Sequence, residues 1–234
     1  MISEQSRWVS ATADCYTTLD NTADLWRISL DRSPCTQWLS EDELTRLHRY
    51  RFEKDQRRFA VARSGLRQIL GRYTQTNPED IVFDYSPRGK PALKFNSQGL
   101  EFNLSHSGEC ALCGVARTPL GVDIEQLRSM DRLGGLVQRC LTPREQRSLQ
   151  QQPASEQSTA FLKYWTCKEA YLKATGQGIS ESLTAIEVEL TPSPSLKAPD
   201  PMWQLRVLFP GPGYTGALVT TPSIRKVRLW SLNG

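Results

Sequence analysis

Two short stretches of the sequence carry acidic and basic side chains at spacings that could build a metal and phosphate site. The first, GVDIE at residues 121–125, alternates apolar and acidic residues and predicts a β-strand. Side chains two apart on a strand share a face, so Asp123 and Glu125 point the same way, with Cα atoms about 6–7 Å apart. The pattern predicts two carboxylates presented together.

The second stretch, WTCKEAYLK at residues 165–173, predicts a helix. Glu169 and Lys173 are four residues apart and are therefore neighbours on one helix face. If the helix meets the strand, Glu169 adds a third carboxylate, and such an all-oxygen site suits a hard cation such as Mg²⁺. Mg²⁺ together with Lys173 is what a diphosphate requires. Each stretch taken alone is more typical of an ordinary solvent-exposed face.

Composition limits the class of protein. The chain has 234 residues, 38% of them hydrophobic, which is enough for one large domain or two small ones. No apolar run approaches the length of a membrane helix, and the first residues lack a signal-peptide pattern, so we expect a cytoplasmic protein with no membrane association. The six cysteines are scattered, and Cys110 and Cys113 lie in an apolar run that predicts buried thiols rather than a zinc or redox site.

The formal net charge of +4 is compatible with an acidic protein partner, an anionic cofactor or nucleic acid. No zinc-finger, RNP-type or heptad signature is present, so nucleic acid is the least favoured of the three.

The order of predicted elements favours an α+β fold. Each half has helices packed on an antiparallel sheet, and we expect a pseudo-twofold pair of similar subdomains at residues 1–118 and 119–234, the second carrying the metal-site motifs. Residues 110–116 and 120–125 should form a hairpin-like unit, while 1–23 and 191–201 should lack regular structure. The remaining predicted strands are 24–30, 81–85, 102–104, 185–190, 203–209, 216–220 and 227–230. The predicted helices are one opening at a capping box of Ser40 and Glu43, a basic one within 49–72, 131–140, one opening at Thr142, and 156–174.

Several segments have both a structural and a functional interpretation. The basic helix is either a solvated face or a phosphate-binding surface. The loop RGKP at 88–91 is either a stiff turn or an anion site. His106 within SHSG (105–108) is interpreted as a phosphate contact, or else a structural histidine, because neighbours on a strand point apart and Ser105 cannot pair with it. Glu145 completes a capping box with Thr142 and is alternatively a catalytic base.

Four motifs in order resemble those of the 4′-phosphopantetheinyl transferases, in the larger, surfactin-synthetase-activating branch. GVDIE at 121–125 and WTCKEAYLKA at 165–174 resemble the family's paired signature, and FNLSHSG at 102–108 and RGKP at 88–91 resemble its two upstream motifs. The resemblance covers roughly residues 44–178. It implies two similar α+β halves in one chain with coenzyme A in the cleft between them.

The resemblance also implies the activity and the residues. The family transfers the phosphopantetheine arm of coenzyme A to a serine of an apo carrier protein and releases adenosine 3′,5′-bisphosphate. Matched to the family's magnesium ligands are Asp123, Glu125 and Glu169, with Mn²⁺ as a possible substitute. The family's coenzyme A contacts are matched by Lys173 at the diphosphate and by Gly89, Lys90 and Pro91 at the adenine and 3′-phosphate. Ser105 and His106 match a pair that contacts a phosphate. Arg58 matches the arginine at the 3′-phosphate, and Arg46 and Arg63 match more loosely.

The resemblance leaves open which group accepts the proton of the serine and which carrier is served. The proton of the attacking serine could go to Glu169, to Glu145 or to a water on the metal. The carrier could serve fatty acid, polyketide or nonribosomal peptide synthesis, and its acidic surface would suit a +4 chain. Chain length favours a monomer. The alternative function is a module that binds coenzyme A or a carrier protein without chemistry.

Overall fold

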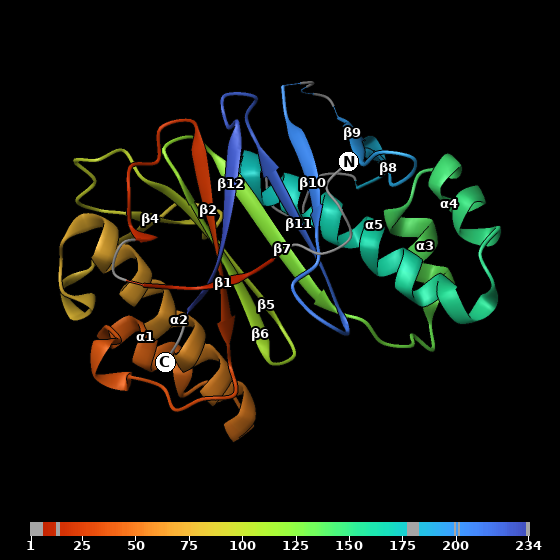
Figure 1. Ribbon diagram of the computed structural model, residues 1–234. Coiled ribbons are helices and arrows are strands. Elements are labelled where there is room, and N and C mark those ends of the chain that lie inside the picture. The colour runs from red at the N-terminus through yellow and green to blue at the C-terminus, as the bar shows by residue number, and fades with distance from the viewer. Residues whose placement is uncertain (1–6, 13–14, 177–182, 199, 201, 233–234) are drawn as a thin grey trace.

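Two β-sheets packed face to face, with a long helix on each outer side, make up the centre of the molecule (Figure 1). The computed structural model describes residues 7–12, 15–176, 183–198, 200 and 202–232. The predicted α+β class is confirmed. Among the described helices, none combines the length and the apolar character that a bilayer-crossing segment requires.

The larger sheet has the strand order β1-β12-β2-β6-β5. It is mixed rather than purely antiparallel, because β12 runs parallel to both of its neighbours. The strand β12, from the second half of the chain, thus belongs to the sheet of the first half. The division into two subdomains at residue 118 stays a prediction. The strands are β1 (Val9–Ser10), β12 (Lys226–Leu232), β2 (Thr22–Ser29), β6 (Cys110–Ala116) and β5 (Glu101–Ser107).

The smaller sheet is antiparallel, with β11 between β10 and β7. Two further strand pairs, β3 with β4 and β8 with β9, stand apart from the main sheets. The strands are β10 (Gln204–Leu208), β11 (Tyr214–Thr220), β7 (Leu120–Gln126), β3 (Phe83–Tyr85), β4 (Pro91–Leu93), β8 (Glu187–Glu189) and β9 (Ser195–Lys197).

Both predicted capping boxes are confirmed, at Ser40 with Glu43 and at Thr142 with Glu145. The last long helix ends at Gly176, whose φ of 71° is the left-handed conformation that glycine adopts without strain. The helices are α1 (Glu41–Leu47), α2 (Glu53–Thr74), α3 (Leu133–Cys140), α4 (Pro143–Gln150) and α5 (Ala154–Thr175), with short 3₁₀ turns at Thr36–Trp38, Pro78–Asp80 and Leu183–Ala185.

Three layers of apolar side chains hold these elements together. Alternation along β2 buries Trp26 against α2 on one face of the larger sheet and Leu25 between the two sheets on the other. In β7, Val122 likewise faces the space between the sheets. The opposite face of the smaller sheet packs on α5 through residues such as Tyr171. Both sheets are therefore buried on both faces.

The expected hairpin of residues 110–125 is not formed. β6 lies between β2 and β5 in the larger sheet, and both of its edges are already paired, so β7 joins the smaller sheet instead. Three short strands were not predicted: β1 lies within the expected lead-in, β4 begins at the end of the expected loop at 88–91, and β9 lies within the expected loop at 191–201. Strands of two or three residues are too short to show an alternating pattern.

α5 lies directly on β7 at a residue without a side chain. A Cβ added to Gly121 would stand 2.0 Å from the backbone oxygen of Ala170 and 2.3 Å from the backbone nitrogen of Ala174. Any side chain at residue 121 would therefore push the helix away from the strand.

We expect Gly121→Ala to lower the free energy of unfolding by about 1–3 kcal/mol, because overpacking against backbone atoms cannot be relieved by a rotamer change. Urea unfolding followed by circular dichroism measures this. The matched control is Gly134→Ala in α3, where a Cβ meets nothing within 4 Å. That variant should be neutral or slightly stabilised, and equal stability of the two variants would contradict the packing argument.

Candidate functional site

The two sequence stretches predicted to meet do meet. The Lys173 ammonium on α5 donates to Asp123 Oδ1 on β7 at 2.6 Å. The same carboxylate oxygen accepts from Ser105 Oγ of β5 at 2.7 Å, and Lys173 also donates to that hydroxyl at 2.9 Å. One carboxylate thus joins a strand of each sheet to the long helix of the second half.

Glu169 lies one turn before Lys173 on α5 and is 5% exposed. Burial raises the pKa of its carboxyl to about 7; the Lys173 ammonium works against this rise, and the negative charges of Asp123 and Glu125 add to it. Burial likewise raises the pKa of Asp123 above its ordinary value, against the lowering effect of Lys173. The site gathers more negative charge than its own lysine neutralises.

Two carboxylate oxygens of the site are buried without a hydrogen-bond partner among the described residues: Asp123 Oδ2 and Glu169 Oε1. A buried acceptor without a hydrogen-bond partner costs about 1–3 kcal/mol, and more when it is charged. Such atoms therefore indicate a bound ligand. Buried carboxylate oxygens are suitable donors for a divalent ion such as Mg²⁺. This donor chemistry fits the predicted metal.

The third predicted ligand, Glu125, is held differently. Its Oε2 accepts from Ser107 Oγ at 2.8 Å and from Arg128 Nη1 at 3.4 Å. Within the described part of the chain, no three His, Cys, Asp or Glu side chains form a group that could hold a metal ion. The shared ligation of one ion by Asp123, Glu125 and Glu169 therefore stays a prediction.

The RGKP loop reaches the same place. Lys90 Nζ donates to the backbone oxygen of Lys173 at 2.8 Å, at the C-terminal end of α5. Burial lowers the pKa of this lysine below its ordinary value. A pocket of about 220 Å³ lies between the loop and the helix. Its lining residues are Arg88, Gly89, Lys90, Pro91, Asn103, Glu169, Leu172, Lys173 and Gly176.

Ser105 and His106 point to opposite sides of β5, as expected for neighbours on a strand. Ser105 is buried against Asp123, whereas His106 is exposed. The pKa of His106 lies below its ordinary value, mainly because the surrounding protein partly removes the imidazole from water. The positive charges of Lys173, Arg46 and Arg58 lower it further. The imidazole therefore lies in a positively charged environment, which is suited to an anion.

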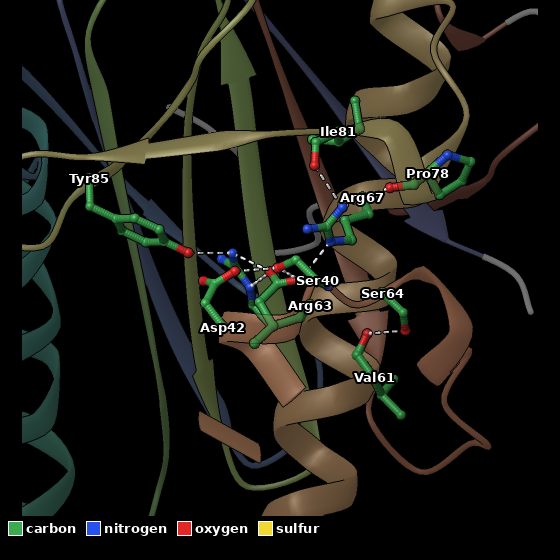
Figure 2. A network of polar contacts seen from close by, with 10 residues as sticks. Ser40, Asp42, Val61, Arg63, Ser64, Arg67, Pro78, Ile81 and Tyr85 are labelled. Carbon is green, nitrogen blue, oxygen red and sulfur yellow. Dashed lines mark hydrogen bonds and ion pairs between the residues drawn. The ribbon is translucent and has the colours of Figure 1, made fainter. Parts of the chain in front are cut away.

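Of the three predicted arginines, Arg63 is bound within the protein. Its guanidinium is ion-paired with the buried Glu43, with Nε 2.5 Å from Oε1, and donates to Tyr85 Oη at 3.1 Å. Arg67 binds the other oxygen of Glu43 and the backbone oxygens of Pro78 and Ile81. Figure 2 shows this network of polar contacts. Arg63 has a structural role here, linking α1, α2 and β3.

The other two arginines are closer to solvent. Arg58 Nη2 lies 2.6 Å from Glu109 Oε1, and the hydrogen bond to Glu109 raises the pKa of the guanidinium. Arg46 stacks over the Phe59 ring, 5.3 Å from its centroid. Together with Arg49 it lines an open hollow of about 720 Å³ beside α1. These positions leave both arginines near the face on which His106 is exposed.

Glu145 is fully engaged in structural contacts. Its Oε2 accepts from the backbone nitrogen of Thr142 at 2.7 Å and from Lys168 Nζ at 2.6 Å, and its Oε1 accepts from the backbone nitrogen of Val188 at 2.7 Å. Lys168 is completely buried and also donates to the backbone oxygens of Cys140 and Leu183. This ion pair joins α3, α4, α5 and β8.

The sequence did not predict the buried ion pairs of Lys168 and Glu43, or the hydrogen bond from Ser107 to Glu125. Lys168 occupies a position on the apolar stripe of α5, one turn after Tyr164 and one turn before Tyr171. A lysine within such a stripe is a signal for a buried partner. Ser107 shows a weaker signal: Ser105 and Ser107 are spaced two apart, as are Asp123 and Glu125.

Comparisons with known proteins agree with this geometry. Residues 119–208 match the model of the 4′-phosphopantetheinyl transferase superfamily, and residues 26–117 match the model of the 4′-phosphopantetheinyl transferase N-terminal region. The 4′-phosphopantetheinyl transferase HetI of Nostoc sp. is 41% identical over 223 residues, which cover 92% of this chain and 94% of that protein. The 4′-phosphopantetheinyl transferase Sfp of Bacillus subtilis is 27% identical over 153 residues, covering 65% of this chain and 67% of its own.

A solved structure of a holo-(acyl-carrier-protein) synthase from Bacillus anthracis in complex with CoA (3′,5′-ADP) is 25% identical. The match covers 44% of this chain and 95% of that one, with a TM-score of 0.40.

We expect Lys168→Met to lower the free energy of unfolding by about 3–5 kcal/mol, because it leaves the Glu145 carboxylate buried without its cation. Adding Glu145→Gln should recover part of this loss. The exposed Lys163 on the same helix provides the control: Lys163→Met should change the stability by less than about 0.5 kcal/mol. Urea titration of the three variants measures the difference, and equal effects of the two lysine substitutions would rule out a structural ion pair.

Proposed function

Because the chain belongs to the 4′-phosphopantetheinyl transferase superfamily, we propose that its site transfers phosphopantetheine with the help of a divalent metal ion. The reaction moves the 4′-phosphopantetheine arm of coenzyme A onto a serine of an apo carrier protein and releases adenosine 3′,5′-bisphosphate. The observation that carries the proposal is the pair of buried, unpartnered oxygens, Asp123 Oδ2 and Glu169 Oε1, beside the Lys173 ammonium.

Asp123, Glu125 and Glu169 are the proposed metal ligands. Supporting this, Asp123 and Glu169 each have a buried oxygen without a hydrogen-bond partner among the described residues, and the negative charges of Asp123 and Glu125 raise the cost of ionising Glu169. When bound, Mg²⁺ or Mn²⁺ supplies positive charge against the non-bridging oxygens of the diphosphate. Which of the two ions is preferred depends on size and ligand flexibility.

Lys173 is the proposed diphosphate contact. Its ammonium reaches the site from α5 and is about 29% exposed, so a substrate oxygen can approach it. Negative charge that grows on the diphosphate during attack on the β-phosphorus is stabilised by a fixed ammonium already held in place by Asp123 and Ser105. The lysine thus needs no rearrangement to meet the transition state.

The nucleotide end of coenzyme A is assigned to the two basic regions beside the site. Gly89, Lys90 and Pro91 line the pocket next to Glu169 and are proposed to contact the adenine. Arg46 and Arg58 act on His106 as positive charges from the α1–α2 side, and we assign the 3′-phosphate to that region. Arg guanidinium groups bind phosphate through paired N–H donors.

The nucleophile is the serine of the carrier protein, so the chain itself needs no serine–histidine pair. Glu145 is left out of the proposed chemistry because both of its oxygens already accept hydrogen bonds from buried donors. A net charge of +4 suits an acidic carrier surface. We propose that the protein acts as a cytoplasmic monomer on carriers of fatty acid, polyketide or nonribosomal peptide synthesis.

Removing a ligand or the metal should abolish transfer. We expect Asp123→Asn and Glu169→Gln each to lower the rate by about 100-fold or more, since each removes charge stabilisation specific to the transition state. The measurement is the mass gain of one phosphopantetheine arm on an apo carrier with coenzyme A and Mg²⁺. EDTA should stop the reaction and excess Mg²⁺ should restore it.

The control for these variants is Glu156→Gln, an exposed carboxylate on the same helix, which should transfer at the wild-type rate. Full activity of Glu169→Gln, or of the wild type in EDTA, would refute the metal assignment. Tight binding of coenzyme A without transfer to any carrier would favour a binding module instead.

The 3′-phosphate assignment has its own test. We expect Arg46→Ala to raise KM for coenzyme A by about tenfold or more, because a charge-assisted hydrogen bond contributes about 1.5–3 kcal/mol. With 3′-dephospho-coenzyme A the variant and the wild type should behave alike. Arg72→Ala, in the last turn of α2, is the control and should match the wild type with both substrates. An equal loss with both substrates would place Arg46 away from the 3′-phosphate.

A further inference from the structure

We propose that Ser107 is a positioning residue for Glu125, whose carboxylate it holds in place for the metal ion. The inference rests on the proposed function and adds a residue from the first half of the chain to the metal site of the second. Ser107 is the last residue of β5, and Glu125 lies near the end of β7.

The hydroxyl of Ser107 has both of its hydrogen-bonding functions fixed. It donates to Glu125 Oε2 at 2.8 Å and accepts from the backbone nitrogen of Gln126 at 3.1 Å. A hydroxyl with a committed donor and a committed acceptor cannot rotate freely, so it holds the carboxylate in a single orientation. The hydrogen bonds to Glu125 from described side chains all use Oε2, which leaves Oε1 for a ligand.

The contact between Ser107 and Glu125 is one of several similar side-chain contacts between two sheet edges. β5 ends the larger sheet and β7 ends the smaller one, so no backbone ladder joins them. Side chains of β5 bridge the gap instead. Ser105 donates to Asp123 at 2.7 Å with the same 18-residue separation as Ser107 and Glu125, and Asn103 Oδ1 accepts from the backbone nitrogen of Val122 at 2.8 Å. Each serine thus holds one carboxylate by one oxygen.

A neutral donor suits this task better than a charged one. A serine hydroxyl fixes the orientation of a carboxylate without cancelling the negative charge that attracts a cation. Glu125 has a charged alternative nearby in Arg128, three residues on, at 3.4 Å and about 54% exposed. Without Ser107, the half-buried Glu125 is free to turn toward this arginine and away from the site. The serine keeps the carboxylate charged and in place.

The test measures metal affinity directly, without carrier protein and without turnover. Free Mn²⁺ is followed by electron paramagnetic resonance during titration of the enzyme with coenzyme A present. We expect Ser107→Ala to weaken Mn²⁺ binding by about tenfold, in the range typical for loss of a group that orients a ligand. Ser107→Thr retains the hydroxyl and should bind Mn²⁺ within about twofold of the wild type. Ser64→Ala removes a buried hydroxyl that donates to the backbone oxygen of Val61 in α2, away from the site, and should leave the affinity unchanged.

A double-mutant cycle separates positioning from a general structural effect. If Ser107 acts through Glu125, then Ser107→Ala should cause no further loss of Mn²⁺ affinity in a Glu125→Ala background. Adding Arg128→Gln to Ser107→Ala should recover part of the affinity, because the competing charge is gone. Urea unfolding of each variant checks that the folded state is retained.

Wild-type affinity in Ser107→Ala, or a full additional loss in the Glu125→Ala background, would overturn the inference. If Asp123→Asn still abolishes Mn²⁺ binding in that case, the proposed metal site stands without Ser107. If the wild type binds no Mn²⁺ with coenzyme A, the metal proposal and this inference both fail.

Discussion

The close contact between α5 and β7 sets the geometry of the whole site. Gly121 lets the helix backbone approach the strand to a distance that any Cβ would forbid. Asp123 follows two residues later on the same face of β7, so it lies directly beneath the helix turn that carries Glu169 and Lys173. One backbone contact therefore determines how far apart two carboxylates and an ammonium can be, and rigid elements on both sides keep that separation constant.

The second constraint is the meeting of two open sheet edges. An edge strand exposes unpaired backbone groups, which usually must be covered or paired. Here the side chains of Asn103 and Ser107 bind backbone nitrogens of β7, so the edges are satisfied without forming a continuous sheet. The junction between the two edges therefore consists of polar groups from both halves of the chain.

The parts of the site that follow from local spacing could be predicted from the sequence. The capping boxes at Ser40 and Thr142 were found because their spacing is fixed by one helical turn. The meeting of Asp123 with Lys173 was predicted from a strand and a helix with matched charges. In contrast, the burial of Arg63 against Glu43 depends on how α1 packs on α2, and an arginine on a basic helix looks the same whether it is buried or solvated.

The dependence of contacts on tertiary packing also explains the other differences between the predicted and the observed structure. The 110–125 hairpin was expected because two apolar strands flank a short turn, but pairing is decided by which neighbours β6 already has. Glu145 could be predicted as a cap, whereas its ion pair with Lys168 connects residues 23 apart through tertiary packing. The orientation of Glu125 toward Ser107 depends on a contact between two different sheets. Spacing within one element carries no information about such contacts.

The position of β12 affects how the chain reaches its folded state during synthesis. Residues 226–232 lie between β1 and β2, although these two strands come from the first thirty residues. On the ribosome, β2, β5 and β6 can associate early, but the outer side of β2 has no partner until residues 226–232 have been translated. The larger sheet is thus completed last, by a contact of about 200 residues in sequence separation, and the nascent first half exposes an unpaired strand in the meantime.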